Sequence, residues 1–280
     1  MLERADRRTV PTAPKEAVKA HYEQESCGAR YGDSAERVAF YQEIERARYE
    51  QDYMIKDFAQ FETARGKRVL EVGLGTGTDF IQWCRAGAEA YGRDLTEAAV
   101  GHVNERLQLE GLTADVGMGD AEALDFPDNY FDIYYSWGVL MYPDTERAIA
   151  EAHRVLKPGG VMKIMLYNHD SVAAFLIWTL YGPLRMRRGT AREIFARQVE
   201  GVGTRIYSRD EVERMVRSSF KKSSVDIQTY LSSGDLLSHR PSAKYSGRMW
   251  RTLIRVYPRW FVRHILGHRF GLHMTISVTK

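Results

Sequence analysis

Cysteine is scarce in this chain, with only Cys27 and Cys84 among 280 residues. Two cysteines this far apart in the sequence indicate neither a disulfide framework nor a cysteine-based zinc site. The start, MLERADRR, lacks an apolar signal segment, and the longest apolar run, 172–184, is too short to span a bilayer. The expectation is therefore a protein in a reducing, cytoplasmic setting.

Acidic residues are missing from the last part of the chain. No Asp or Glu follows Asp235, whereas nine of the 40 Lys and Arg residues lie there. The other 31 stand against all 37 acidic residues, so the chain up to Asp235 carries a net charge of −6, although the whole chain carries +3. The hydrophobic content of 44% and the charged content of 28% are ordinary for a globular protein. The length suits one α/β domain with insertions, or two small domains.

The sequence VLEVGLGTG at 69–77 predicts a strand, a tight turn and the start of a helix. Apolar and β-branched residues surround Glu71, and Gly73, Gly75 and Gly77 occupy alternate positions before a helical pattern. Glycines let the backbone approach a ligand closely, and a helix start directs free N–H groups at negative charge. A turn also needs glycine for steric reasons alone, so these residues by themselves leave a ligand site and a purely structural turn as alternatives.

A second predicted strand, 88–94, ends in Asp94 and is followed by Leu95. In a doubly wound sheet this position lies beside the first turn, where a carboxylate can accept both hydroxyl protons of a ribose. The alternative is that Asp94 is a solvated strand end. The dinucleotide fingerprint G-x-G-x-x-G would need a glycine at position 78, where this chain has Thr78. The spacing therefore favours a nucleoside other than a dinucleotide.

With the pattern E-x-G-x-G-x-G, the chain resembles the class I S-adenosylmethionine (SAM)-dependent methyltransferases that act on small molecules. The resemblance continues in order through GDAEALDFPD at 119–128, NYFDIYYSWGVL at 129–140 and AHRVLKPGG at 152–160. It implies an α/β fold with a Rossmann-like sheet of seven strands, mostly parallel, with helices on both faces and an antiparallel last strand. It also implies SAM as the cofactor and S-adenosylhomocysteine as the product, with no metal ion required.

The resemblance assigns cofactor roles to residues along the chain. Glu71 would lie near the methionine amino group, Asp94 would bind the ribose, and the segment after residue 118 would bracket the adenine. Similar enzymes carry an aromatic residue near an upstream Cys-Gly pair, which makes Tyr22 a candidate to cover the sulfonium and Arg48 one to bind the methionine carboxylate. A plain helix–loop–helix is the alternative for 21–32. The predicted cofactor residues are Glu71, Gly73, Gly75, Gly77, Asp94, Leu95, Asp120, Ala121, Ser136, Tyr22 and Arg48.

Alternating helical and strand patterns predict the domain organisation. Residues 1–66 would form a helical arm and cap, and 67–280 the SAM-binding domain, with helical insertions at about 171–204 and 231–269. The expected helices include 15–25, 34–61, 77–86, 96–110 and 144–155; the expected strands are 67–73, 88–94, 113–118, 130–136, 160–167, 225–230 and 272–279.

Methyl transfer to an O, N or C atom is an in-line displacement, so the enzyme mainly has to position the acceptor. Ligands bind beyond the carboxyl ends of parallel strands, which draws attention to the residues near the ends of the fourth and fifth strands. There, His169 is the first candidate for an optional base, because imidazole titrates near neutral pH. Tyr167 and Tyr142 could orient the acceptor. The alternative for His169 is an ordinary surface or capping residue.

A basic, aromatic segment separates the last two expected strands. Arginines recur every three or four positions among aromatic and aliphatic residues, and Pro258 should interrupt the helix. The arginines are Arg248, Arg251, Arg255, Arg259 and Arg263. The pattern fits a lid or a homo-oligomer surface. It also fits a face for an anionic partner, either the small-molecule acceptor itself or a membrane surface contacted peripherally.

Three functional alternatives follow from these patterns. The first is methylation of a small molecule, the second is methylation of a membrane-associated lipid or quinone, and the third is SAM binding by a non-catalytic subunit. Nucleic acid is disfavoured as a partner, because the chain has no separate RNA-binding module and its overall charge is modest.

Overall fold

A computed structural model describes residues 13–182, 189–198, 202–221, 223–237 and 255–280. The expectations for Arg248 and Arg251 lie outside the described residues. Within the described part, no helix combines the length and the apolar character that crossing a membrane requires.

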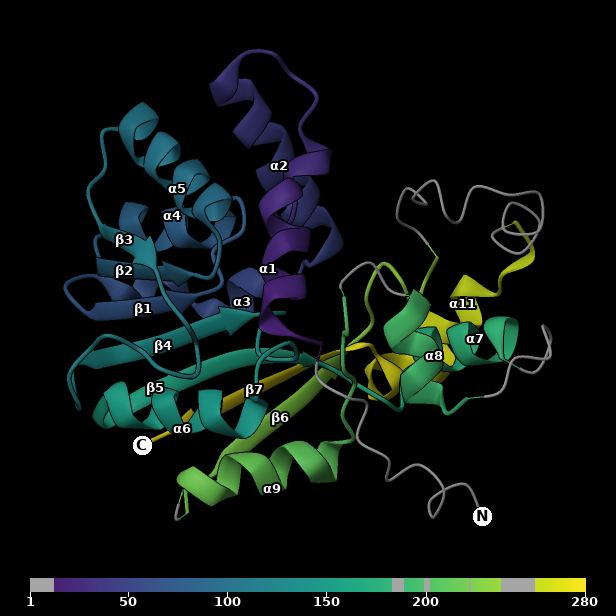
Figure 1. Cartoon of the computed structure of the whole chain (residues 1–280). Coiled ribbons are helices and arrows are strands. Elements are labelled where there is room, and N and C mark those ends of the chain that lie inside the picture. The colour runs from purple at the N-terminus through teal and green to yellow at the C-terminus, as the bar shows by residue number, and fades with distance from the viewer. Residues whose placement is uncertain (1–12, 183–188, 199–201, 222, 238–254) are drawn as a thin grey trace.

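One sheet of seven strands forms the centre of the molecule, in the order β3-β2-β1-β4-β5-β7-β6 (Figure 1). The strands are β1 (Arg68–Val72), β2 (Glu89–Asp94), β3 (Asp115–Met118), β4 (Phe131–Trp137), β5 (Leu156–Tyr167), β6 (Val225–Tyr230) and β7 (His273–Thr279). Strands β1 to β5 pair in parallel, whereas β7 runs antiparallel to both β5 and β6. The expected Rossmann-like sheet with an antiparallel last strand is confirmed.

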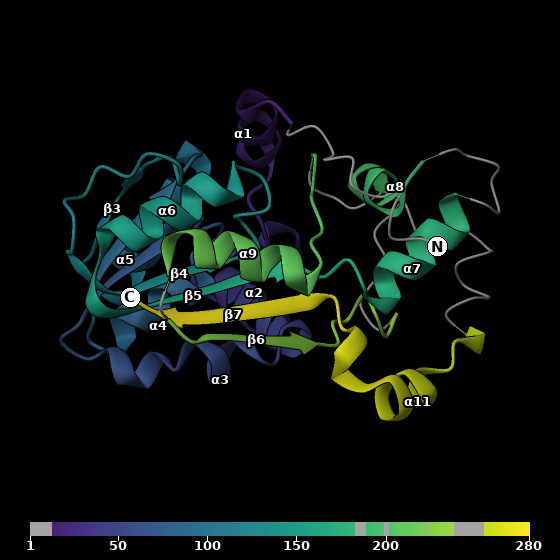
Figure 2. The same cartoon turned by 90° about the horizontal axis from the view of Figure 1, so that it is seen from below.

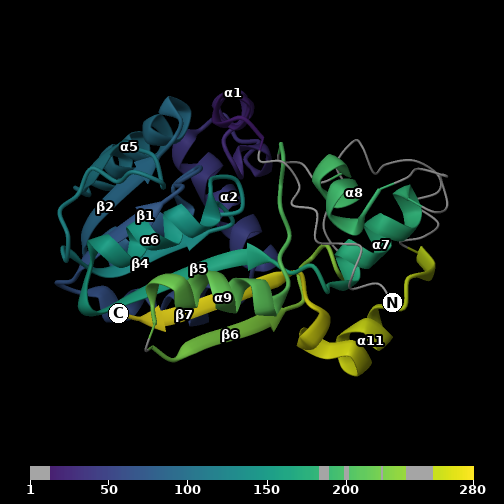
Figure 3. The same cartoon turned by 60° about the horizontal axis from the view of Figure 1, so that its bottom comes forward.

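Helices cover both faces of this sheet. Helices α6 and α9 contact each other on one face, and α3 and α4 lie on the other (Figures 2 and 3). Helices α7, α8 and α11 gather beyond the end of the sheet toward which β4 points (Figure 1). The α-helices are α1 (Lys15–Gln24), α2 (Arg37–Gln51), α3 (Ile55–Ala59), α4 (Thr78–Arg85), α5 (Glu97–Glu110), α6 (Thr145–Val155), α7 (Val172–Tyr181), α8 (Ala191–Gln198), α9 (Arg209–Ser219) and α11 (Arg259–Phe261); shorter helical turns cover Ala29–Tyr31, Phe61–Ala64, Val262–Leu266 and Gly267–Phe270.

Side-chain caps begin several of these helices where the sequence supplies short polar residues. The Thr96 side chain accepts the first-turn N–H of α5, and Asp144 does the same for α6. Ser208 and Glu211 form a reciprocal capping box at the start of α9. These local bonds satisfy backbone donors that have no partner within the helix itself.

The N-terminal helices differ from the expectation. The single helix expected over 34–61 is wrong, because α2 ends at Gln51 and α3 begins only at Ile55. Between them the chain turns, and Met54 and Ile55 are buried in the core. Asp52, the residue directly after α2, caps the C-terminal end of this helix. The fifth strand also starts earlier than expected, at Leu156.

Helices α1 and α2 and the helical turn between them, called the cap below, are tied to the rest of the protein by polar contacts. The Glu23 carboxylate accepts hydrogen bonds from the backbone N–H groups of Glu97 (3.1 Å) and Ala98 (2.9 Å) at the start of α5. Lys15 Nζ donates to Asp120 Oδ2 at 2.5 Å. Helix α1 therefore lies across the ends of β2 and β3, where the sequence predicts the cofactor.

Lys163 is a buried cation within β5. Its Nζ donates to the carbonyl oxygens of Phe58 (2.9 Å) and Ala59 (2.8 Å) and to Gln60 Oε1 (2.9 Å), at the end of α3. Burial lowers the pKa of the Lys163 amine to about 8. The ordinary lysine pKa is about 10.4, so between these two values the unfolded chain binds a proton that the folded chain has released.

This difference in proton binding predicts how stability changes with pH. The unfolding free energy of the wild type, relative to Lys163→Met, should rise by about 2–3 kcal/mol between pH values of about 8 and 10.4, because unfolding must then take up a proton. Urea denaturation of both proteins across this range measures the difference. Parallel pH curves for the two proteins would contradict the prediction.

Candidate functional site

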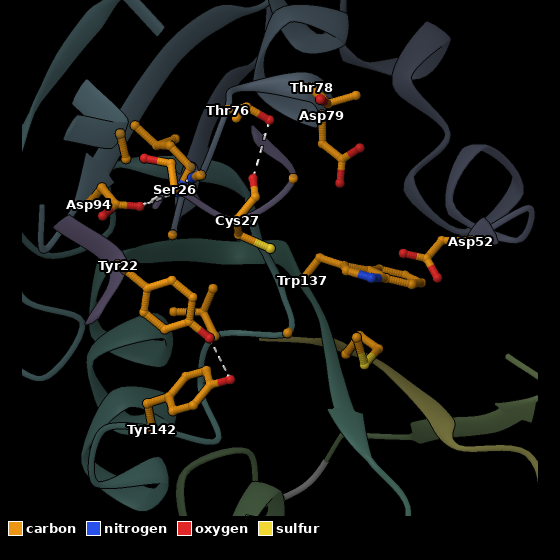
Figure 4. Close-up of a pocket in the computed structure, with 18 of the residues that line it drawn as sticks. Tyr22, Ser26, Cys27, Asp52, Thr76, Thr78, Asp79, Asp94, Trp137 and Tyr142 are labelled. Carbon is orange, nitrogen blue, oxygen red and sulfur yellow. Dashed lines mark hydrogen bonds between the residues drawn. The ribbon is translucent and has the colours of Figure 1, made fainter. Parts of the chain in front are cut away.

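A cavity of about 810 Å³ lies at the carboxyl ends of β1, β2, β4 and β5. Its walls come from the cap and from the ends of these strands, as Figure 4 shows for Tyr22, Asp94 and Trp137. The first residue of β7 reaches the same end of the sheet, because β7 runs antiparallel to β5. The size falls within the range of small-molecule sites.

The glycine turn after β1 forms part of the cavity wall through Gly73 and Gly75. Gly73 has a φ of +83°, and a Cβ built on it would lie 2.1 Å from a methyl carbon of Val139. Gly77 has a different place: it is not among the residues that line the cavity, and a Cβ on it would lie 2.8 Å from Val103 of α5. The predicted cofactor role of Gly77 is therefore better described as close packing of α4 against α5.

Asp94 holds the glycine turn in place. Its Oδ2 accepts from the backbone N–H groups of Leu74 (2.6 Å) and Gly75 (3.3 Å), while its Oδ1 accepts from the backbone N–H and the hydroxyl of Thr96. Leu95, Asp120 and Ala121 line the same end of the cavity, as the sequence predicted. These four bonds use about as many lone-pair sites as a carboxylate has, and the bond from Gly75 is the longest of them, so a ribose hydroxyl at Asp94 would share or replace that bond.

Buried charges form the deep wall of the cavity. Arg48 Nη2 donates to Asp79 Oδ2 at 2.8 Å and Nη1 donates to Asp52 Oδ2 at 3.4 Å. The buried Nε of Arg48 has no hydrogen-bond partner among the described residues. Glu71 is 3% exposed and accepts from Trp83 Nε1 at 2.9 Å, and burial raises the pKa of its carboxyl well above the usual range. Arg48 and Glu71 both line the cavity, and their cofactor roles stay predictions.

Two predicted tyrosines meet across the cavity. The Tyr22 hydroxyl donates to the Tyr142 hydroxyl at 2.7 Å, which joins α1 to the segment after β4 (Figure 4). The Thr204 hydroxyl donates to the same Tyr142 oxygen at 3.2 Å. Burial raises the pKa of Tyr22, so its hydroxyl stays protonated. Tyr167, the third predicted tyrosine, also lines the cavity.

Ser136 and His169 do not line the cavity, which corrects their predicted roles. The Ser136 hydroxyl is buried and donates to the carbonyl oxygen of Val72 at 2.8 Å, which ties β4 to β1. The His169 ring lies 2.8 Å from Asp170, through Nδ1 and Oδ1. Just after β5, the backbone N–H of His169 donates to the carbonyl oxygen of Tyr207, which fixes the course of the chain at this point. Following a strand end does not decide on which side a side chain emerges.

His273 and Asp52 are two wall residues that sequence analysis missed. His273 begins β7, and its Nδ1 lies 3.5 Å from Asp52 Oδ1. The two are far apart in the chain, and Asp52 seemed to belong to a continuous helix. The only available signal for His273 was its place at the start of the last strand, which an antiparallel course brings to the ligand end of the sheet.

Beyond His273 the cavity becomes apolar. The side chains there come from α7, from α8, from the segment after β6 and from the residue before β7. The aliphatic and aromatic members are Ala173, Leu176, Ile177, Phe195, Leu237 and Leu272. Trp137 and Tyr167 stand between this apolar part and the glycine turn. One cavity therefore joins a polar, nucleoside-like end to an apolar chamber.

Part of the sheet resembles a domain of known proteins. The family model of a methyltransferase domain matches residues 69–160. The chain is 32% identical over 114 residues to the ubiquinone/menaquinone biosynthesis C-methyltransferase UbiE of Cupriavidus metallidurans, a match that covers 39% of this chain and 47% of the relative. These matches show that residues 69–160 form a methyltransferase domain. The chain thus spans about half the length of the methyltransferases that it matches in sequence.

Solved structures extend this likeness over nearly the whole chain. The geranyl diphosphate C-methyltransferase of Streptomyces coelicolor A3(2) has a TM-score of 0.63 and 15% identity, covering 97% of this chain and 99% of that one. The [4+2]-cyclase SpnF has a TM-score of 0.56 and 18% identity, covering 98% of this chain and 99% of that one. Such low identities show a shared fold alone, and this methyltransferase fold also hosts a cyclase.

The position of Asp94 predicts its effect on cofactor affinity. Asp94→Asn should weaken SAM binding by about 10- to 100-fold, because an amide cannot replace a charged acceptor for both the turn and a ribose. Isothermal titration measures the affinity. Asp132→Asn is the matched control, because Asp132 also accepts a backbone N–H, from Arg68 at 2.8 Å, but does not line the cavity. Equal affinities for wild type and Asp94→Asn would remove Asp94 from the cofactor site.

Proposed function

We propose that this chain transfers the methyl group of SAM to a small, largely apolar aromatic acceptor, by direct in-line displacement at an O, N or C atom. The observation that carries the proposal is the single cavity with two unlike ends. A polar end beside the glycine turn suits the cofactor, and an apolar chamber behind Trp137 and Tyr167 suits the acceptor.

The polar end has the charge that SAM needs. The carboxylates of the buried Asp79 and the half-buried Asp94 lie along its wall, and carboxylates favour the positive sulfonium and amino groups of the cofactor. Glu71 adds a buried carboxyl whose raised pKa favours its neutral form. Arg48, which lines the cavity, adds one positive group for the methionine carboxylate. Asp120 lies at the other end, near the place predicted for adenine. The predicted cofactor roles thus remain proposals that this distribution of charge supports.

The apolar end favours an uncharged acceptor over the anionic one that the sequence left open. Among the described residues that line this part of the cavity, His273 is the side chain that can become charged. An anion placed among Leu176, Ile177 and Phe195 would lose its hydration without gaining a lysine or arginine partner among the described residues of this part of the cavity, at a cost of several kcal/mol. Aromatic rings at the entrance to this chamber favour a flat, apolar ring.

The chemistry requires placement more than activation. The acceptor atom must approach the methyl carbon from the side opposite the sulfur, and fixing two reactants in this way can supply roughly 7–11 kcal/mol of a barrier in favourable cases. The hydrogen bond between the Tyr22 and Tyr142 hydroxyls fixes α1 on the cavity wall, where this helix would limit the access of water to the reacting atoms.

A methyl-transfer screen tests the proposal. Titration with SAM should show specific binding, and radiolabelled SAM should label at least one of 1-naphthol, 1-naphthalenethiol and 1,4-naphthalenediol. Leu176→Arg should abolish transfer while leaving SAM affinity within about twofold, because it places a charge in the chamber and not in the cofactor end.

The matched control is Leu109→Arg, which changes an exposed leucine of α5. Binding of SAM without labelling of any of the three acceptors would contradict the proposal and favour a non-catalytic subunit. The absence of SAM binding would contradict both the proposed methyl transfer and the non-catalytic SAM-binding subunit.

We further propose that the acceptor is drawn from an anionic lipid surface. The segment 255–270 exposes five large apolar side chains, and α7 adds Phe175. The five are Val256, Trp260, Phe261, Ile265 and Phe270, with exposed fractions between 38% and 70%. Arg255, Arg263 and Arg269 are exposed in the same segment, which contains no acidic residue. Apolar and cationic groups together are the composition of an interfacial segment.

The inner side of this segment touches the chamber wall. Tyr257 and Val262 are buried against Leu176 and Leu237, two residues that line the cavity. The Tyr257 hydroxyl donates to the carbonyl oxygen of Asp235 at 2.7 Å, which fixes the segment there. A lipid-soluble acceptor would thus have a short path from the surface to the chamber. This supports the membrane-associated alternative, in line with relatives named as quinone methyltransferases.

Vesicle co-sedimentation tests the lipid surface. The protein should bind vesicles of phosphatidylglycerol and phosphatidylcholine more than vesicles of phosphatidylcholine alone, and added salt should weaken the binding. Trp260→Ser with Ile265→Ser should reduce the bound fraction several-fold, whereas Leu109→Ser should not. Equal sedimentation of all variants would refute this surface. A dimer in solution that only the Trp260 and Ile265 changes dissociate would assign the patch to contact between two copies instead.

A further inference from the structure

His273 is fixed at the junction between the two ends of the cavity. It pairs with Tyr167 of β5, and its side chain is 6% exposed. The Tyr167 ring stacks on the imidazole, with centroids 5.9 Å apart and planes at 14°, and the Trp137 ring meets it edge-on at 5.8 Å. Two aromatic rings therefore hold the imidazole in one orientation on the cavity wall.

Asp52 faces the imidazole from the end of α2. Its Oδ1 lies 3.5 Å from His273 Nδ1, and that nitrogen has no hydrogen-bond partner among the described residues. A carboxylate on this side favours the tautomer that carries the proton on Nδ1, which leaves the lone pair of Nε2 as the acceptor. The same carboxylate accepts from Arg48 at 3.4 Å, so its position is set by α2 itself.

Other polar groups on the described wall are less suited to take up a proton from an acceptor. Asp79 accepts from Arg48 and from the Tyr135 hydroxyl at 3.0 Å, and it lies in the deep wall of charges at the cofactor end. Burial keeps the Tyr22 hydroxyl protonated, since it raises the pKa of that group. His21 lies on α1, where its ring contacts Tyr22. His273 is the imidazole that stands beside both Trp137 and the apolar chamber.

We propose that His273 is the general base of the methyl transfer and that Asp52 positions it; this inference rests on the proposed function. The acceptor oxygen or nitrogen forms the new bond to the methyl carbon as the sulfur–methyl bond breaks and its electron pair stays on the sulfur. The proton of the acceptor passes to Nε2, and the resulting imidazolium is stabilised by the carboxylate of Asp52. An acceptor that reacts at carbon loses the proton of its ring hydroxyl to the same nitrogen, and after the methyl group is attached the ring carbon releases its own proton while the oxygen takes one up again.

The charged and titratable groups around His273 come from three elements. Helix α2 contributes Asp52 and, bound to it, Arg48; β5 contributes Tyr167; and Tyr230 of β6 lies opposite His273 in the strand register. Of these, the carboxylate of Asp52 is the group whose charge favours an imidazolium.

Two acceptors of nearly the same shape test the base. Slightly above neutral pH, 1-naphthol is protonated and needs a base, whereas 1-naphthalenethiol is largely ionised and does not. The cost of bringing the thiolate into the apolar chamber lowers its rate in wild type and variant alike, so it cancels when the two proteins are compared. His273→Gln should lower kcat/KM for 1-naphthol by about 10²- to 10³-fold but for the thiol by less than about fivefold. Asp52→Asn should show the same pattern with a smaller loss, about tenfold on 1-naphthol. Imidazole added to His273→Gly should restore part of the naphthol rate.

The control is His169→Gln, which changes a histidine away from the cavity wall and should alter neither rate. SAM affinity, measured by titration, should stay within about twofold of wild type in every variant. Any one of four results would overturn the role of His273 as the base while leaving the proposed methyl transfer standing. These are equal losses on both acceptors, no loss on 1-naphthol, transfer by the wild type to the thiol alone, and no rescue by imidazole. A wild type that methylates neither acceptor would instead contradict the proposed function.

Discussion

The hydrogen bonds from the glycine turn to Asp94 are the interaction on which the site depends. They join the end of β1 to the end of β2 and fix a backbone in which Gly73 and Gly75 both have positive φ. Any side chain at Gly73 would meet Val139, so the turn can exist only with glycine there. With the turn held in this way, bare backbone faces the cavity, and the cofactor end has its shape before any ligand arrives.

The acceptor end depends on contacts of another kind. There the walls are apolar side chains from segments that follow β5 and precede β7, and buried polar ties hold them together. The Asp235 carboxylate accepts from the backbone N–H groups of Ala173, Ser232 and Leu272, and thereby connects α7, the loop after β6 and the start of β7. The cavity thus combines a glycine turn held by Asp94 with a chamber whose parts are held together by Asp235.

The local part of this architecture could be predicted from the sequence. The strand, turn and helix around Gly73 and Gly75 depend on neighbouring residues, and so do the capped helices, which is why their places agree with the pattern. The break at Asp52 could not be predicted in this way, because no glycine or proline marks it and the core in which Met54 and Ile55 are buried is formed with distant segments. Periodicity describes one element at a time.

The candidate site also contains residues that could be predicted from the sequence and residues that could not. The positions of Asp94, Asp120 and Tyr142 on the wall were found because a motif or a strand end marks them. His273 was missed because its meeting with Asp52 joins residues from opposite ends of the chain through the pairing of β5 and β7. His169 was chosen for following a strand, but hydrogen bonds of the surrounding backbone direct it elsewhere.

A crystal structure of the protein with S-adenosylhomocysteine tests the central claim most directly. The account predicts the ribose hydroxyls at Asp94, the adenine beside Asp120 and Ala121, and the sulfur directed past Trp137 toward the apolar chamber. A glycine turn closed to the ligand, or a ligand bound with its sulfur directed away from that chamber, would contradict it.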